Sequence, residues 1–322
     1  MLLRKFEKLD SQNMELKSQL TIRQQWHDSR LAFDDQGGQV KLLRMTDESP
    51  IWTPDLYFSN GKDGIRPNLL NPTTLIFIHP DGEVKYSTIV FLTTYCPMDM
   101  GYFPHDAQVC PVMVGPFGHS PDDIVFQWRS DSPIEVKSQQ PVNDFNFMEV
   151  RGQIYSPLSV KFVFERQFSP YWLRVYIPCI FFVCLAYLFL WIRREEYRFM
   201  LSLIVTITLA CLIAFVSDNF PNTSYIKSVD IWTGTCLTFA TASLLLVIVL
   251  SQMPQESGKR RQSLEDGKDD PFVGKQAPDT GPRWIKKITR TLVQKAARIG
   301  YPVLFLLFSL VYWITQGRTH LP

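Results

Sequence analysis

The sequence has few cysteines, little net charge and no motif for catalysis. Its 322 residues include six cysteines and five histidines, and the net charge is +2. We find no metal-ligand spacing, nucleophile motif, phosphate loop or internal repeat, so nothing indicates an enzyme, a metal or a cofactor. The net charge itself says little about nucleic acid, and we expect no nucleic acid partner.

Charge is almost absent from four apolar segments in the second half of the chain, at roughly 171–192, 199–217, 229–250 and 299–316. Each is about the length of a membrane-spanning helix, because about 20 residues at 1.5 Å per residue cross about 30 Å of hydrocarbon. Four such segments favour a membrane protein over a soluble protein with buried helices.

The loop between the third and fourth segments is rich in lysine and arginine. By the positive-inside rule it is cytoplasmic, and counting spans places the N-terminal half and the C-terminus outside the cell. We therefore expect a multi-pass protein of the plasma membrane. The opening MLLRKFEKLD is no signal peptide, so we expect a leader that was removed or that lies upstream.

The N-terminal half predicts strands. QLTIRQQW, KYSTIVFLTTY and VKFVFERQ are rich in β-formers, and turn signals separate them. We predict a β-sandwich over 1–168 whose last strand, 160–167, leads into the first span. Three helices occupy 169–251. A cytoplasmic loop covers 252–298, disordered at first and ending in an amphipathic helix, and 299–322 holds the fourth span and a short extracellular tail.

The segment EEYRFMLSLIVTITLACLIAFVSD, residues 195–218, has acids at both ends. At 100° per residue a single helical face joins them through an apolar middle. Its members are Glu196, Met200, Ile204, Ile207, Cys211, Ala214 and Asp218. Another face carries Ser202 and Thr206, whose hydroxyls can bond to helix backbone instead of water.

Only Cys96 and Cys110 lie in the outer half, so we expect them to form a disulfide. The segment between them, CPMDMGYFPHDAQVC, resembles the loop that names the Cys-loop receptors, the pentameric ligand-gated ion channels. The segments IWTPDLYFSN, FERQFSPYWLRVYIP and SYIKSVDIW resemble the same family, most closely its glycine and GABA branch. The resemblance implies four further copies of the chain around a pore lined by the second span, with ligand sites between neighbouring outer domains.

The family pattern implies a set of ligand-binding residues. On one face these are Tyr57, Phe117, His119 and Tyr155; on the other is Arg23, and Thr21 and Ser87 are further candidates. Aromatic rings attract ammonium groups and arginine binds carboxylates, so a small amine or amino acid fits such a site. Packing within the sandwich is the alternative for the aromatic residues, and His119 is either a surface histidine or a proton sensor.

The same pattern implies that the Cys loop presses on the membrane domain through Phe103, Pro104 and Asp106, touching the segment at Pro221. Arg166 is the expected ionic partner of Asp106, unless the two form only a solvated pair.

The family register places the seven residues of the acid-ended face on the channel axis. Rings of Glu196 and Asp218 favour cations, and Glu196-Tyr197 stands where anion-selective relatives have Pro-Ala. We therefore expect a cation-preferring channel in contact with membrane lipid and permeant ions. The alternatives are an anion channel of glycine or GABA type, and a non-conducting accessory subunit whose rings of Met200, Ile204 and Ile207 keep the pore dry.

Overall fold

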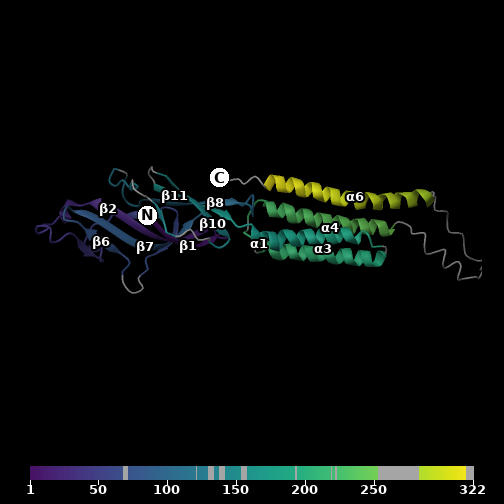
Figure 1. Cartoon of the computed structure of the whole chain (residues 1–322), viewed down its shortest axis with the longest axis horizontal. Helices are drawn as coiled ribbons and strands as arrows, with labels where there is room; N and C mark the ends of the chain where they lie inside the picture. Colours follow the sequence, from purple (N-terminus) through teal and green to yellow (C-terminus); the bar gives the residue numbers. More distant parts are fainter. Residues whose placement is uncertain are drawn as a thin grey trace, which may run out of the picture. The chain divides into compact units, whose positions relative to one another are not determined.

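The chain folds into two compact units (Figure 1). The computed structural model describes residues 1–67, 72–120, 122–129, 134–137, 142–153, 158–192, 194–218, 220–221, 223–252 and 283–316, with the backbone alone at 152–153 and 283–290. The β unit comprises Met1–Phe168 and Pro221–Tyr225, and the helical unit comprises Ser169–Phe220 and Ile226–Arg318.

The β unit contains two sheets, as the predicted sandwich requires. The larger sheet has the order β3-β6-β7-β2-β1-β9, with β5 also paired to β7. Its strands are β1 (Leu2–Asp10), β2 (Glu15–His27), β3 (Leu43–Met45), β5 (Gly61–Ile65), β6 (Leu75–Ile78), β7 (Glu83–Tyr95) and β9 (Glu135–Val136). The smaller sheet has the order β10-β11-β8-β4. Its strands are β4 (Leu56–Phe58), β8 (Ala107–Pro116), β10 (Phe145–Gln153) and β11 (Leu158–Arg166), and a 3-10 helix, η1 (Ser29–Leu31), follows β2.

Apolar side chains hold the two sheets together. The ring of Phe6 on β1 lies 5.2 Å from that of Phe162 and 4.8 Å from that of Phe164, both on β11. The predicted disulfide between Cys96 and Cys110 is present, and it ties the residue after β7 to β8 in the other sheet. Such a crosslink contributes roughly 2–4 kcal/mol to stability.

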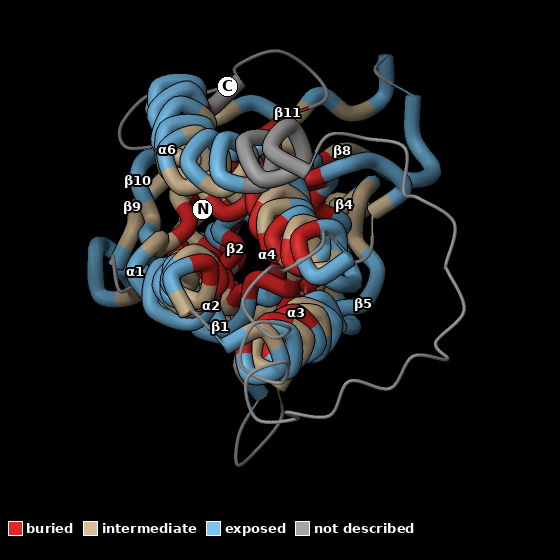
Figure 2. Tube along the Cα trace, turned by 90° about the vertical axis from the view of Figure 1, so that its right-hand side faces the viewer, coloured by how far each residue is buried: buried red, intermediate tan, exposed pale blue. Residues whose placement is uncertain are grey.

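Within the residues that the structure describes, the helical unit has four helical segments long and apolar enough to cross a membrane. The first combines α1 (Ser169–Tyr171), the π-helical turn η2 (Trp172–Tyr176) and α2 (Ile177–Phe189); the others are α3 (Glu195–Ser217), α4 (Ser228–Gln252) and α6 (Arg283–Gln316). As predicted, α6 continues without a break from the amphipathic segment into the fourth span. The helices in Figure 2 are largely exposed, and buried residues occupy only part of each of α2, α3 and α4.

Aromatic residues join three of these segments. Trp232 of α4 is fully buried, and its ring lies 4.9 Å from that of Tyr312 on α6 and 5.3 Å from that of Tyr176 on η2. The hydroxyls of Tyr176 and Tyr312 are hydrogen bonded at 2.8 Å. These contacts pack the fourth span against the others within the subunit.

Some predictions fall outside the described residues. These are Tyr155, the loop at 253–282 and the tail at 317–322. The four domain ranges and the disorder of the loop therefore stay predictions.

Candidate functional site

Tyr57 and Phe117 are brought together by strand pairing. Tyr57 lies on β4 opposite Gly115 of β8, and Phe117 follows the end of β8. Their ring centroids are 5.2 Å apart. Tyr57 is 46% exposed and Phe117 is 78% exposed. Both rings are therefore available at the surface rather than packed in the sandwich core.

Asp55 holds the turn that carries Phe117. Its Oδ2 accepts hydrogen bonds from the backbone N–H of Phe117 at 3.2 Å and of Gly118 at 2.7 Å. The same oxygen lies 2.9 Å from Nδ1 of His119. The hydrogen bond with Asp55 raises the pKa of His119, and the bonds from His119 and Gly118 lower the pKa of Asp55. Sequence reasoning missed Asp55, although it lies two residues before Tyr57 in the quoted segment.

Arg23 and Ser87 lie in the other sheet, directly opposite each other on β2 and β7. Arg23 Nη1 is 3.3 Å from Oε2 of Glu135 on β9, and both side chains are about half exposed, at 52% and 47%. Arg23, Ser87 and Glu135 line a cavity of about 1070 Å³. An exposed pair of this kind contributes less than about 1 kcal/mol to stability, so Arg23 is available to another carboxylate.

Arg4, on β1 in the same sheet as Arg23, is a second arginine that sequence reasoning missed. The β1–β2 register shifts between Leu3 and Lys5, which leaves Arg4 at a bulge. A bulge redirects a side chain, and here Arg4 Nε donates to Thr21 Oγ1 at 2.7 Å. Thr21 is buried at 4% exposure, and its hydroxyl holds the Arg4 guanidinium through this bond.

The pair formed by Asp106 and Arg166 is buried. Arg166 Nε lies 2.7 Å from Asp106 Oδ1 and Nη2 lies 3.0 Å from Oδ2, with both side chains 3% exposed. The guanidinium also lies over the rings of Phe103 at 4.7 Å and Phe145 at 4.2 Å. The alternative of a solvated surface pair is therefore wrong. Pro104 is buried beside Phe103.

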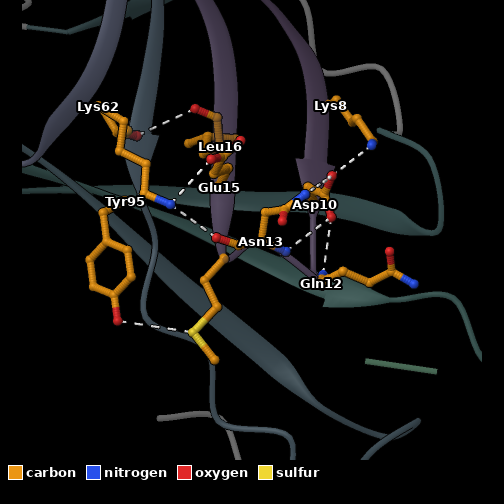
Figure 3. Close-up of polar contacts among 10 residues, drawn as sticks. Lys8, Asp10, Gln12, Asn13, Glu15, Leu16, Lys62 and Tyr95 are labelled. Atoms are coloured by element: carbon orange, nitrogen blue, oxygen red, sulfur yellow. Dashed lines mark hydrogen bonds and ion pairs between the residues drawn. The ribbon is translucent and has the colours of Figure 1, made fainter. Parts of the chain in front are cut away.

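The turn between β1 and β2 is hydrogen bonded to Arg166 and to the Cys loop. Arg166 Nη2 donates to Ser11 Oγ at 3.2 Å, and the N–H of Cys96 donates to the carbonyl of Met14 at 2.9 Å. Lys62 on β5 donates to the carbonyl of Asn13 at 3.1 Å (Figure 3). These bonds tie the turn to the Cys loop and to the end of β11.

The carboxylate of Asp10 holds this turn through hydrogen bonds to residues on both sides of it in the chain (Figure 3). Its carboxylate accepts from Lys8 Nζ at 2.6 Å and from the backbone N–H groups of Gln12 at 3.0 Å and Asn13 at 3.3 Å. These bonds, that from Lys8 foremost, lower the pKa of Asp10 to about 2. Asp10 is therefore ionised throughout the physiological pH range.

Pro221 and Tyr225 belong to the β unit although they follow α3 in the chain. Pro221 is buried, and the Tyr225 hydroxyl accepts the backbone N–H of Met100 in the Cys loop at 2.8 Å. The Cys loop therefore touches the segment that contains Pro221, at a residue the sequence did not indicate.

The two faces of α3 differ in burial. The predicted pore-lining residues are all exposed in the single chain: Glu196, Met200, Ile204, Ile207, Cys211, Ala214 and Asp218. Ser202 and Thr206 are buried, and Thr206 Oγ1 donates to the carbonyl of Ser202 at 2.8 Å and to that of Ala240 on α4 at 3.5 Å. The hydroxyl face therefore packs inside the subunit, and the acid-ended face is exposed in the single chain.

Comparisons with known proteins agree with this architecture. Residues 1–175 match the family described as neurotransmitter-gated ion-channel ligand binding domain, and residues 175–279 match the neurotransmitter-gated ion-channel transmembrane region. The chain is 31% identical to a glutamate-gated chloride channel of Drosophila melanogaster, over 94% of this chain and 80% of the relative. It is 28% identical to a glutamate-gated chloride channel subunit beta of Haemonchus contortus, over 97% of this chain and 82% of the relative.

These matches confirm the predicted family, with an extracellular outer domain and four membrane-spanning helices in the plasma membrane. The family consists of ion channels rather than enzymes; it forms pentamers, is gated by small ligands and passes ions. Both named relatives are chloride channels, so the anion alternative fits better than the predicted cation preference. The chain belongs to the Cys-loop family of neurotransmitter-gated ion channels and is a membrane-spanning subunit of a ligand-gated channel.

Proposed function

We propose that this chain forms an anion channel opened by an acidic amino acid, with L-glutamate as the ligand. The observation that carries the proposal is the pair of arginines on one sheet, Arg4 fixed by Thr21 and Arg23 only loosely paired to Glu135. The relatives named above are glutamate-gated chloride channels, which supports both the ligand and the permeant ion.

Two arginines suit a ligand with two carboxylates. A guanidinium presents its N–H groups as a rigid fork that matches a carboxylate, and such charge-assisted bonds are about twice as strong as neutral ones. Glu135 lies at 3.3 Å from Arg23 and is half exposed, so a ligand carboxylate can displace it at small cost. Ser87, opposite Arg23, offers a further hydroxyl.

The ammonium group of the ligand would lie against the exposed rings of Tyr57 and Phe117. A cation over an aromatic face gains about 0.5–2 kcal/mol. The rings lie on the smaller sheet and the arginines on the larger one. Each subunit thus supplies two half-sites, which neighbouring subunits of a homopentamer would bring together. In this scheme Asp55 and His119 position Phe117, and Tyr155 is a further candidate for contact with the ligand.

In the membrane, we propose that the acid-ended face of α3 lines the pore. Met200, Ile204 and Ile207 would form apolar rings that gate by dewetting. Their exposure in the single chain supports this arrangement. Ligand binding would move the Cys loop and the Pro221 segment, and the helices would then widen the rings.

The test is current from cells expressing the full chain alone. L-glutamate, glycine, GABA and acid are applied in turn, and the reversal potential is measured while chloride and then sodium is replaced. We expect L-glutamate to open a current whose reversal potential follows chloride. A current opened equally by glycine, or one that follows sodium, would contradict the ligand or the ion respectively.

A cation-preferring channel is the second candidate, because Glu196 and Asp218 are exposed at the two ends of the acid-ended face. Acidic rings favour cations, and a sodium-dependent reversal potential identifies this candidate. A silent wild type that conducts after Ile204→Ser and Ile207→Ser indicates a pore held dry. A chain that stays silent after both changes is the accessory subunit.

A further inference from the structure

Gln108 is a buried polar residue on β8, between Asp106 and Cys110, with 2% of its surface exposed. Its Nε2 donates to Asp106 Oδ2 at 2.5 Å and to the carbonyl of Asp99 at 2.6 Å. Its Oε1 accepts the backbone N–H of Asp99 at 3.1 Å. Both amide hydrogens and the amide oxygen are therefore in use, as burial of a polar group requires.

These three bonds select a neutral amide. Two acceptors, a carboxylate and a carbonyl, face the nitrogen of Gln108, and one donor faces its oxygen. A carboxylate at this position would lose both donors and place a negative charge against Asp106. An apolar side chain would leave the backbone N–H and C=O of Asp99 without these partners, which costs about 1–3 kcal/mol per buried group.

Gln108 joins two contacts that are otherwise separate. On one side, Asp99 is followed by Met100, whose N–H donates to the Tyr225 hydroxyl at 2.8 Å. On the other side, Asp106 holds Arg166, the last residue of β11. Tyr225 lies in the chain between α3 and α4, and β11 leads into the first span. A continuous set of bonds thus links the segment between α3 and α4 to the end of β11.

We propose that Gln108 is a positioning residue for gating: it fixes the tip of the Cys loop to the Asp106–Arg166 pair, so that the Tyr225 segment and the end of β11 move together. The inference rests on the proposed function only for the choice of L-glutamate as agonist. Gln108 is buried, and it acts through its contacts with Asp99 and Asp106.

The decisive variant is Gln108→Glu, which keeps the size of the side chain and removes both donors. Gln36→Glu is the matched control, because Gln36 is exposed in a turn and the same charge is added there. Gln108→Met, of similar length and uncharged, replaces Gln108→Glu if the latter fails to reach the cell surface. The first measurement is backbone hydrogen exchange of the purified full-length protein, without ligand.

In Gln108→Glu we expect exchange at Met100 to rise by about tenfold or more, as for the loss of a buried hydrogen bond, and exchange in the control to match the wild type. The second measurement is single-channel open probability at saturating L-glutamate. We expect the open probability to fall by about fivefold or more, which corresponds to the lower end of the free energy lost with a buried hydrogen bond. In Gln36→Glu it should be unchanged. A residue important only for folding would change the number of channels and not the open probability of each one.

Unchanged exchange at Met100 overturns the proposal, and so does an unchanged open probability in a variant whose exchange has risen. A wild type that does not respond to L-glutamate instead contradicts the proposed function. In that case the hydrogen-exchange measurement alone tests the role of Gln108. The exchange rates at Met100 and at Tyr225 must then both rise in Gln108→Glu. Exchange that rises at Met100 but not at Tyr225 then overturns the proposal.

Discussion

Two arginine–carboxylate pairs in the same β unit have opposite surroundings. Arg166 and Asp106 are each 3% exposed and form two bonds at 2.7 and 3.0 Å. Arg23 and Glu135 are about half exposed, and their nearest atoms are 3.3 Å apart. The same two kinds of charged group are thus locked together at one site and exchangeable at the other.

This difference follows from solvation. Breaking a buried pair leaves an uncompensated charge in a low-dielectric surrounding, whereas water and salt replace an exposed partner at little cost. The buried pair is therefore suited to transmit movement, and the exposed arginine is suited to exchange Glu135 for a ligand carboxylate.

The largest effect is expected from Asp106→Ala. Removing the carboxylate leaves the buried Arg166 charge without this partner, and the expected loss of stability is about 3–5 kcal/mol. Thermal unfolding of the purified full-length protein and the number of channels at the cell surface measure it. Glu135→Ala is the matched control at the exposed pair. Equal losses of stability in the two variants would contradict the difference between the buried and the exposed pair.

Arg23→Gln comes next. We expect the L-glutamate concentration for half-maximal current to rise by about 10- to 100-fold, the equivalent of one charge-assisted hydrogen bond or slightly more. The unfolding temperature should not change, because the Arg23 pair is exposed. Arg30→Gln is the control, because Arg30 is likewise an exposed arginine paired to a carboxylate, that of Asp28. A fall in the unfolding temperature without a change in the half-maximal concentration would assign Arg23 to folding.

A smaller effect is expected from pH at His119. Asp55 raises the pKa of His119, with a further contribution from Asp123. The contact of protonated His119 with Asp55 is therefore fully present below the ordinary pKa of about 6.5 and is lost as pH rises through the raised value. Because this contact positions Phe117, we expect glutamate potency to fall between about pH 6 and about pH 9, by less than about fivefold.

Concentration–response curves across this pH range provide the measurement. His119→Gln keeps a donor for Asp55 without the charge, so its potency should not vary with His119 protonation. A pH dependence that persists in His119→Gln would place the titrating group elsewhere.

The smallest effect is expected from Glu135→Gln. The exposed pair contributes less than about 1 kcal/mol, so the unfolding temperature should hardly change. Because Glu135 competes with the ligand for Arg23, the half-maximal glutamate concentration should fall by about twofold. A rise instead would mean that Glu135 helps to bind the ligand.

The sequence predicted the four spans, the disulfide and the two faces of α3 because each of these features depends on residues that are close together in the chain. Hydropathy identified the four spans, the paired cysteines identified the disulfide, and the 3.6-residue period separated the two faces of α3. The hydroxyl face was expected not to need water, and Thr206 indeed bonds to backbone carbonyls.

The residues that were missed depend on contacts that spacing does not reveal. Arg4 reaches Thr21 because of a bulge, and no sequence pattern marks that bulge. Asp55 and Gln108 act through backbone N–H and C=O groups of other segments. The cation preference was inferred from the acidic residues Glu196 and Asp218 and from Glu196-Tyr197 in place of Pro-Ala, whereas the named relatives are chloride channels.

The central claim is that two arginines of one subunit bind a ligand with two carboxylates. L-glutamate and L-glutamine differ only in the second carboxylate, so the ratio of their half-maximal concentrations in wild type and in Arg4→Gln tests the claim most directly. We predict that L-glutamate is more potent than L-glutamine by about 10- to 100-fold in the wild type. Arg4→Gln should reduce this ratio to less than about threefold, because it removes one charge-assisted contact. Equal potency of the two ligands in the wild type, or a ratio unchanged by Arg4→Gln, would contradict it.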